Sequence, residues 1–314
     1  MARHVVNSEP NTVTDVFSNE MAPILTMASG DELQVRSLDA SGSMEKHSFP
    51  GDKVPMMIPG RRGHCLVGPI EVEGATAGTV LAIKFKSLVP EDWGWTASAV
   101  LDNSLNQRLG ILDAGPRWLL WSIDVSKGIA TNQFGISRSL APFLGVVGVP
   151  PTATGEHSTV PPRTRGGGNI DCKELVAGST LFIPVTVPGA MLCLGDGHAA
   201  QGDGEVSGTA IECAMTSEVV VNVIEDPPVE GIFAETPAGR ITFGFNPDLN
   251  VAMSDALNAM VTWMTKIFNL DRGEALALGS SLVDMRITQV ANQSFDVPSS
   301  TGRHLETHKH SVLA

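Results

Sequence analysis

The sequence predicts a β-rich α+β fold, in which sandwich-like or barrel-like sheets precede a C-terminal pair of helices. Glycine (32) and proline (20) are plentiful among the 314 residues, which indicates many turns between many short elements. Several early segments alternate apolar and polar residues with period two, whereas helical spacing appears only after residue 250. We expect two tightly packed β-rich lobes, residues 1–150 and 151–314, or one domain made of both.

The predicted strands lie in the first two thirds of the chain. Residues 24–27 and 33–38 flank a Ser-Gly-Asp turn and are expected to pair as a hairpin. Residues 79–88 alternate apolar and polar side chains, as a half-buried strand does. Residues 180–187 alternate in the same way, and Pro184 predicts an edge position for that strand because proline cannot donate to a neighbour.

The predicted helices follow near the C-terminus. In residues 253–268 the apolar side chains recur at i, i+3, i+4 and i+7, and Ser254 or Asp255 is expected to cap the start. The Asp-Arg-Gly-Glu sequence that opens residues 271–282 matches a capping box and predicts a second helix. A further strand is expected over residues 285–290.

Charge and hydropathy restrict the partners. The chain carries 34 acidic and 21 basic residues, a net charge of −13, which would repel nucleic-acid phosphates. The first residues contain no apolar stretch of the secretory type, and no apolar run approaches the length of a membrane span. We therefore expect a cytoplasmic protein that contacts neither nucleic acid nor membrane.

The acidic, glycine-rich segment 195–212 carries the strongest chemical pattern. It reads GDGHAAQGDGEVSGTAIE and contains no lysine or arginine. Acids and an imidazole packed this closely repel or titrate unless a cation intervenes, and their oxygen and nitrogen atoms are ligands for divalent metals. The alternative is a solvated acidic hairpin, because Asp-Gly pairs are common in turns. The ionisable residues of the segment are Asp196, His198, Asp203, Glu205 and Glu212.

Spacing within this segment favours convergence. Asp196 and His198 are two residues apart and would project from one face of an extended chain. Asp203 and Glu205 repeat that spacing, so a loop could direct both pairs to one centre. Because the segment follows the apolar residues 191–194, we expect it to be a loop at the edge of a sheet.

Two other segments add ligand-type residues. His64 follows Gly63 shortly before a Gly-Pro turn, and Asn169 and Asp171 end a run of three glycines. Glycine runs let the backbone approach a ligand closely because no Cβ intervenes. A lone histidine is more often structural, but His64 becomes a candidate ligand when it joins such a set.

These motifs together resemble the acetamidase/formamidase family. The resemblance spans most of residues 20–292 in the family's order, and the GDGHAAQGDGE string is its most specific part. Ser207 stands where family members often carry cysteine, which argues against a catalytic cysteine there. The matching stretches are residues 63–83, 142–151, 161–190, 195–212 and 284–292.

The resemblance implies hydrolysis of a short linear amide, of the formamide or acetamide type, to a carboxylate and ammonia. It also implies a β-rich fold, a divalent metal and a cytoplasmic homo-oligomer, dimeric or larger. A histidine with carboxylates favours zinc, while the many oxygens leave calcium or magnesium open.

Roles for individual residues follow from the same resemblance. The implied metal ligands are His64, Asp171, Asp196 and His198. Glu205 and Glu212 are implied as a further ligand and a proton-transfer group, in an order left open. Gln201 and Asn169 are suited to bind the substrate by hydrogen bonds or to orient a ligand.

Three alternatives compete with a metalloamidase. A thiol amidase would use Cys172 with Lys173 and Glu174, or Cys65 with His64, although adjacent side chains point apart. A serine amidase at residues 280–281 is weaker, because a capped helix explains that stretch. The third alternative is a protein of the same fold that binds a metal or a small solute without catalysis. All four cysteines, which also include Cys193 and Cys213, are expected to be reduced and mostly buried.

Overall fold

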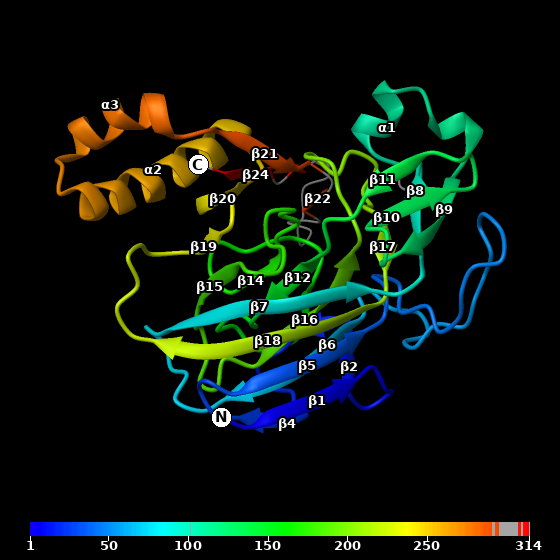
Figure 1. Cartoon of the computed structure of the whole chain (residues 1–314), viewed down its shortest axis with the longest axis horizontal. Coiled ribbons are helices and arrows are strands. Elements are labelled where there is room, and N and C mark those ends of the chain that lie inside the picture. The colour runs from blue at the N-terminus through cyan, green and yellow to red at the C-terminus, as the bar shows by residue number, and fades with distance from the viewer. Residues whose placement is uncertain (101, 291–292, 295–306, 309, 314) are drawn as a thin grey trace, which may run out of the picture.

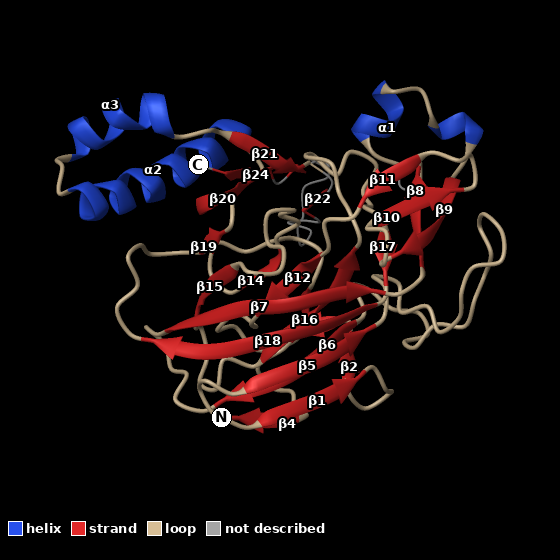
Figure 2. Ribbon diagram, in the orientation of Figure 1, coloured by secondary structure: helices blue, strands red, loops and turns tan. Residues whose placement is uncertain are grey.

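Two large β-sheets stack face to face in the computed structural model, which describes residues 1–100, 102–290, 293–294, 307–308 and 310–313. In Figure 1 the long strands β7 (Val80–Pro90) and β18 (Met215–Ile224) cross in front of β12 (Phe143–Gly148) and β16 (Leu192–His198). One apolar cluster with side chains from both sheets fills the space between them. The predicted β-rich α+β fold with C-terminal helices is confirmed (Figure 2).

The first sheet contains nine strands, most of them antiparallel to their neighbours. Its order is β1 (Arg3–Asn7), β5 (Glu32–Ser37), β18, β7, β15 (Thr180–Pro184), β19 (Phe233–Thr236), β20 (Gly239–Asn246), β24 (His310–Leu313) and β21 (Arg286–Gln289).

The second sheet contains eleven strands and carries the acidic segment. Its main order is β11 (Ser137–Ser139), β10 (Ile129–Asn132), β9 (Arg117–Asp124), β8 (Trp93–Ser98), β17 (Glu212–Cys213), β16, β12 and β14 (Gly167–Asn169). Strand β6 (Leu66–Val72) also pairs with β16 and with the short strands β2 (Val13–Thr14) and β4 (Leu25–Met27). Smaller elements are β3 (Val16–Phe17) paired with β13 (His157–Ser158), β22 (Gln293–Ser294) paired with β23 (Thr307–His308), the helix α1 (Ser104–Arg108) and a 3₁₀ turn at Leu112–Ala114.

Strand β7 shows why alternation predicted it correctly. Leu81, Ile83 and Phe85 are fully buried against the second sheet, while Lys84 and Lys86 are exposed. A two-residue period places successive side chains on opposite faces, so one apolar face is enough to fix the strand in the sandwich.

The predicted hairpin between residues 24–27 and 33–38 is wrong. Strand β4 pairs in parallel with β6 in the second sheet, whereas β5 pairs with β1 and β18 in the first. The turn between them crosses from one sheet to the other. It is held by other strands, since Gly30 N donates to Val221 O and the Asp31 carboxylate accepts from Ala2 N and Ala28 N.

Two further expectations need correction. Strand β15 lies between β7 and β19 and is not an edge strand, and Pro184 is tolerated because it is the last residue of the strand. Helix α2 (Leu249–Phe268) begins earlier than predicted, and its cap is Asp248, whose carboxylate accepts from Asn250 N and Val251 N. The capping box at Asp271, which opens α3 (Arg272–Leu282), is confirmed.

Helix α2 packs on an extension of the first sheet, and α3 packs on α2. Helix α2 lies against β20, where Gly244 lets the Ala252 carbonyl approach closely and Thr242 Oγ1 donates to Ala256 O. Among the described ranges, no helix is long and apolar enough to cross a membrane.

Strands from both predicted lobes interleave in each sheet. Strand β18 lies between β5 and β7, and β16 lies beside β6 and β12. The boundary near residue 150 stays a prediction, and it does not coincide with a break between the sheets.

Candidate active site

Strand β16 places Asp196 and His198 in the middle of the second sheet. We predicted that the acidic segment forms a loop at a sheet edge. The chain between β16 and β17 is a loop, but the prediction is wrong for residues 195–198, because all seven residues of β16 are buried and β17 and β12 flank it. Gly195 and Gly197 allow close strand packing and do not form a turn. A Cβ at Gly197 would lie 2.6 Å from Cys213 O.

Three of the predicted site residues converge around His198. Its Nε2 atom lies 3.5 Å from Asp196 Oδ1, 3.4 Å from Glu212 Oε2 and 4.0 Å from Glu205 Oε1. All four side chains are buried. The predicted projection of Asp196 and His198 from one face of the strand is therefore present. Glu205 reaches the same place from the loop before β17, and Glu212 reaches it from β17 itself.

The donor atoms form two overlapping groups that share His198. Asp171, Asp196 and His198 can bring one donor atom each within 4.8 Å of one another, and so can His198, Glu205 and Glu212. Such spacing suits ligands of one ion or of two adjacent ions.

Gly145 in β12 provides the room for the first group. A Cβ there would lie 2.7 Å from Asp171 Oδ1 and 2.8 Å from His198 Cε1, and it would collide with the Asp196 carboxylate. The carbonyl of Gly145 accepts from Ile170 N, at 2.9 Å, so the loop after β14 lies beside β16 at this point. No pattern in the sequence singles out Gly145, although it lies in the family-like stretch 142–151.

Three of the acidic site residues have unusual backbones. Asp171, Asp196 and Glu205 have φ angles of 48°, 61° and 42°. Residues other than glycine seldom adopt this left-handed region, and strain of this kind is concentrated at functional sites. The surrounding sheet thus holds these carboxylates in directions that a relaxed strand or turn would not give.

Gln201 orients the histidine. Its Oε1 lies 3.0 Å from His198 Nδ1, and its Nε2 donates to Asp171 O at 2.9 Å. With the amide oriented in this way, Nδ1 is the donor and Nε2 faces the carboxylates. The edge of the His198 ring also contacts Phe143, with 4.9 Å between ring centroids.

His64 lies at the margin of this cluster. Its Nε2 is 3.9 Å from Asp196 Oδ2, and its Nδ1 is 3.0 Å from Thr159 Oγ1. Burial lowers the pKa of His64, which favours a neutral imidazole. Asn169 lies in β14, two residues before Asp171, and its buried Oδ1 has no hydrogen-bond partner among the described residues.

Asp203 does not join the cluster. We expected it to converge with Glu205, but its carboxylate lies 3.0 Å from Lys173 Nζ and 2.6 Å from an Arg286 nitrogen, partly exposed to solvent. The acidic segment contains no cation of its own, and two cations from distant parts of the chain neutralise this one member.

The buried carboxylates perturb one another strongly. Burial raises the pKa of Glu212 to about 7, and burial and nearby Asp171 raise the pKa of Glu205 well above its usual value. Burial opposes the charged form of His198, yet the carboxylates of Glu212 and Asp196 raise the pKa of this imidazole well above its usual value. Asp196 differs, because the nearby imidazoles of His198 and His64 lower its pKa in spite of burial. Glu205 and Glu212 therefore favour bound protons or a cation over free carboxylates.

The residues fit a divalent metal ion. Beyond the contacts to His198, Asp196 Oδ1 and Glu212 Oε2 are buried without a hydrogen-bond partner among the described residues. Oxygens in this position cost free energy unless a proton or an ion satisfies them. One imidazole with several carboxylates is a donor set that zinc accepts, and its oxygens also suit calcium or magnesium.

Comparison with known proteins agrees with this geometry. The model of the acetamidase/formamidase family matches residues 3–155 and 152–301. The chain belongs to the acetamidase/formamidase family. This confirms the resemblance found in the motifs.

Individual relatives support the same assignment. A formamidase of Methylophilus methylotrophus is 27% identical over 255 residues, which cover 65% of this chain and 62% of that protein. An acetamidase of Mycolicibacterium smegmatis is 57% identical over 49 residues, 16% of this chain and 12% of that protein. The crystal structure of an acetamidase from Bacillus halodurans superposes with a TM-score of 0.82 at 25% identity, covering 99% of this chain and 96% of that one. The predicted enzyme class, an amidohydrolase acting on linear amides, agrees with these names.

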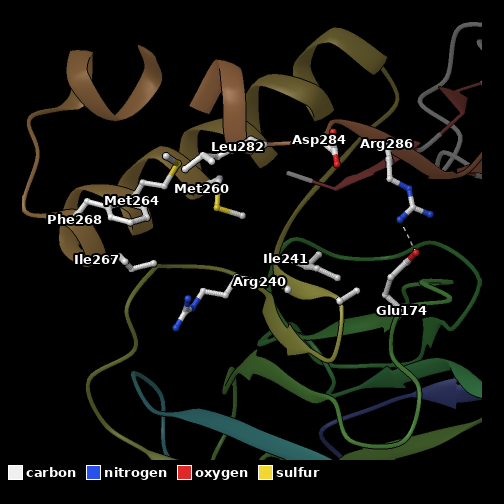
Figure 3. Close-up of a pocket in the computed structure, with 13 residues that line it drawn as sticks. Glu174, Arg240, Ile241, Met260, Met264, Ile267, Phe268, Leu282, Asp284 and Arg286 are labelled. Carbon is white, nitrogen blue, oxygen red and sulfur yellow. Dashed lines mark hydrogen bonds and ion pairs between the residues drawn. The ribbon is translucent and has the colours of Figure 1, made fainter. Parts of the chain in front are cut away.

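Residues of the acidic segment 195–212 line one of two cavities and not the other. A cavity of about 310 Å³ adjoins the cluster, since Gln201 and Glu205 line it. A larger cavity of about 390 Å³ lies between α2, α3 and β20, with apolar walls and the Arg286–Glu174 ion pair at one end (Figure 3). It contains none of the predicted site residues, so size alone does not identify the active site, and we assign the site to the smaller cavity.

The cysteines do not form a thiol amidase site. All four are buried, and burial raises the pKa of Cys65 to about 12 and that of Cys172 well above its usual value. Cys172 Sγ lies 3.4 Å from Glu174, while Lys173 turns to Asp203. Neutral buried thiols are poor nucleophiles, so this alternative loses its support.

Proposed function

We propose that this protein hydrolyses the C–N bond of a short linear amide and releases a carboxylate and ammonia. The observation that carries the proposal is the buried cluster around His198, in which carboxylates with raised pKa values lie beside a cavity in a chain of the acetamidase/formamidase family. The relatives named formamidase and acetamidase give the class of amide.

A divalent ion, for which we propose zinc, would be held by Asp171, Asp196 and His198, with Glu212 and the marginal His64 as further ligands. Such an ion polarises a carbonyl group and lowers the pKa of water toward ~7. Gln201 keeps Nε2 of the histidine directed at the carboxylates. Asn169 stays a predicted substrate-binding residue.

Glu205 is the proposed proton carrier. It lines the cavity and also lies 4.0 Å from His198, so it alone among the acids of the cluster borders both the ligand set and the substrate space. Its carboxylate would accept a proton from water as the water oxygen bonds to the amide carbon. The same proton would pass to the nitrogen as the C–N bond breaks and ammonia leaves. Glu212 is more restrained, because its Oε1 accepts from Ala210 N at 2.8 Å.

The test is ammonia release from formamide, acetamide and propionamide, before and after chelation, with the metal content of the same sample measured. We expect turnover that disappears with the metal and returns with zinc. A metal-loaded protein without turnover would favour binding without catalysis.

A matched variant sharpens this experiment. His198→Ala should lose bound metal and reduce kcat/KM by at least a hundredfold, whereas His157→Ala, at a half-buried histidine outside the cluster, should change neither. A metal-replete and active His198→Ala protein would contradict the assignment. The homo-oligomeric state and the cytoplasmic location stay predictions.

A further inference from the structure

The cavity beside the cluster is where the rest of a bound amide would lie. Gln201 and Glu205 form its inner end, and the opposite wall comes from β8, β9 and the β10–β11 turn. If an amide carbonyl reaches Glu205, as the proposed function requires, its acyl chain must extend into this space.

The walls of the cavity are more apolar than their residue types suggest. The hydroxyl groups of Thr96, Ser207 and Thr209 all donate to backbone carbonyls, so none of the three has a free hydroxyl proton to offer a ligand. Trp121 Nε1 donates to Thr96 Oγ1 at 3.0 Å, so its ring also has no polar atom left to satisfy. Ile211 and Ala200 complete a buried apolar floor.

Apolar side chains are exposed to water at the mouth of the cavity, which costs free energy. Ile136 is 61% exposed and Val206 is 66% exposed, and both line the opening. Of the charged residues near the mouth, Asp203 is neutralised by Lys173 and Arg286, and Arg138 of the exposed strand β11 also lines the cavity. Convergent exposed apolar residues above an apolar floor indicate a site for an apolar group.

The volume exceeds the need of the smallest amides. At roughly 30 Å³ for one water-sized group, the four non-hydrogen atoms of acetamide would fill about 120 Å³. The cavity measures about 310 Å³. We infer that this protein takes a linear amide whose acyl chain is uncharged, apolar and longer than acetyl, with room for up to about eight carbons by the same measure. This inference rests on the proposed amide hydrolysis.

The experiment compares acetamide, butyramide and hexanamide with the metal-loaded enzyme. Each added methylene that leaves water for an apolar wall should raise kcat/KM about three- to fourfold, up to hexanamide. The variant Ile136→Asp places a carboxylate at the mouth and should reduce kcat/KM for hexanamide at least tenfold while acetamide changes less than twofold.

Phe134→Asp is the matched control. Phe134 is 71% exposed and belongs to the same turn, but it does not line the cavity, so this variant should keep the chain-length preference. A kcat/KM that falls with each methylene, or an Ile136→Asp effect equal for acetamide and hexanamide, overturns the inference and leaves amide hydrolysis standing. If no amide of the series releases ammonia, the proposed function fails and the inference fails with it.

Discussion

The amide of Gln201 shows how one neutral side chain can set the chemistry of a charged cluster. It accepts from His198 Nδ1 and donates to Asp171 O, and it therefore connects two candidate ligands. A partner of this kind fixes the ring and directs the other nitrogen to a metal. The sequence suggested a substrate contact or an orienting role for Gln201, and the hydrogen bonds favour the second.

Gln201→Ala should therefore weaken metal binding about 10- to 100-fold without unfolding the protein. The loss arises because His198 can rotate once its Nδ1 partner is gone. Metal affinity, measured by competition with a coloured chelator, is the readout. The exposed Gln107→Ala is the control, and an unchanged affinity in Gln201→Ala would argue against the orienting role.

Gly145 is the second residue on which the site depends. Gly145→Ala would push a methyl group against Asp171, Asp196 and His198, and we expect at least a tenfold loss of metal affinity together with about 1–3 kcal/mol of stability. Gly202→Ala is the control, since a Cβ there meets nothing within 4 Å. Elemental analysis of the purified variants gives metal per chain, and full occupancy in Gly145→Ala would refute the crowding argument.

Among the elements, β21 restrains the loop that carries Glu205 through hydrogen bonds. Gly204 N donates to Thr288 O and Val290 N donates to Gly204 O, both at 2.8 Å. Arg286 adds contacts of 2.6 Å to Asp203 and to the mostly buried Glu174. A C-terminal strand thus restrains an acidic loop more than 80 positions away in the sequence.

Arg286→Ala should lower the free energy of unfolding by about 1–3 kcal/mol, because the Glu174 carboxylate would lose its cation in a poorly solvated place. It should also lower kcat, since Glu205 would be held less firmly. Urea unfolding and amide kinetics are the measurements. Arg240→Ala removes an ion pair in which both side chains are 52% exposed and should cost less than about 1 kcal/mol. Equal losses in both variants would show that β21 does not restrain the loop.

At the scale of the whole molecule, the sandwich buries its acids in the centre of a sheet. The folded pKa of Glu212 is about 7, above its ordinary value of 4.5, so the metal-free folded state binds more protons than the unfolded state between these values. His198, whose pKa is also raised, acts in the same direction. Their contribution to stability is fully present at low pH and is lost as pH rises through the folded pKa values.

The metal-free protein should therefore lose about 3 kcal/mol of stability between pH 5 and pH 8, and Glu212→Gln should show a shallower decline. With metal bound the trend should reverse, because a cation stabilises the ionised carboxylates and competes with protons. Urea unfolding at several pH values, with and without chelator, measures both trends. A metal-free stability that rises toward pH 8 would contradict the pKa shifts.

Local sequence determined a definite part of this protein. Three features depend on residues only a few positions apart: the alternation of β7, the capping box at Asp271 and the pairing of Asp196 with His198. Strand periodicity and capping are short-range properties, so the sequence predicts them without knowledge of the fold. The family motifs likewise predicted most of the candidate site residues within residues 195–212.

Only the tertiary structure decided which acids enter the buried cluster. Asp203 and Glu205 look equivalent in the sequence, yet Arg286 neutralises the first while the sheet buries the second beside His198. The space left by Gly145 comes from a strand about 50 positions before β16, and the hairpin expected around Gly30 failed because distant strands hold that turn. Burial and counterions are set by neighbours far apart in the chain, and residue spacing alone contains no information about them.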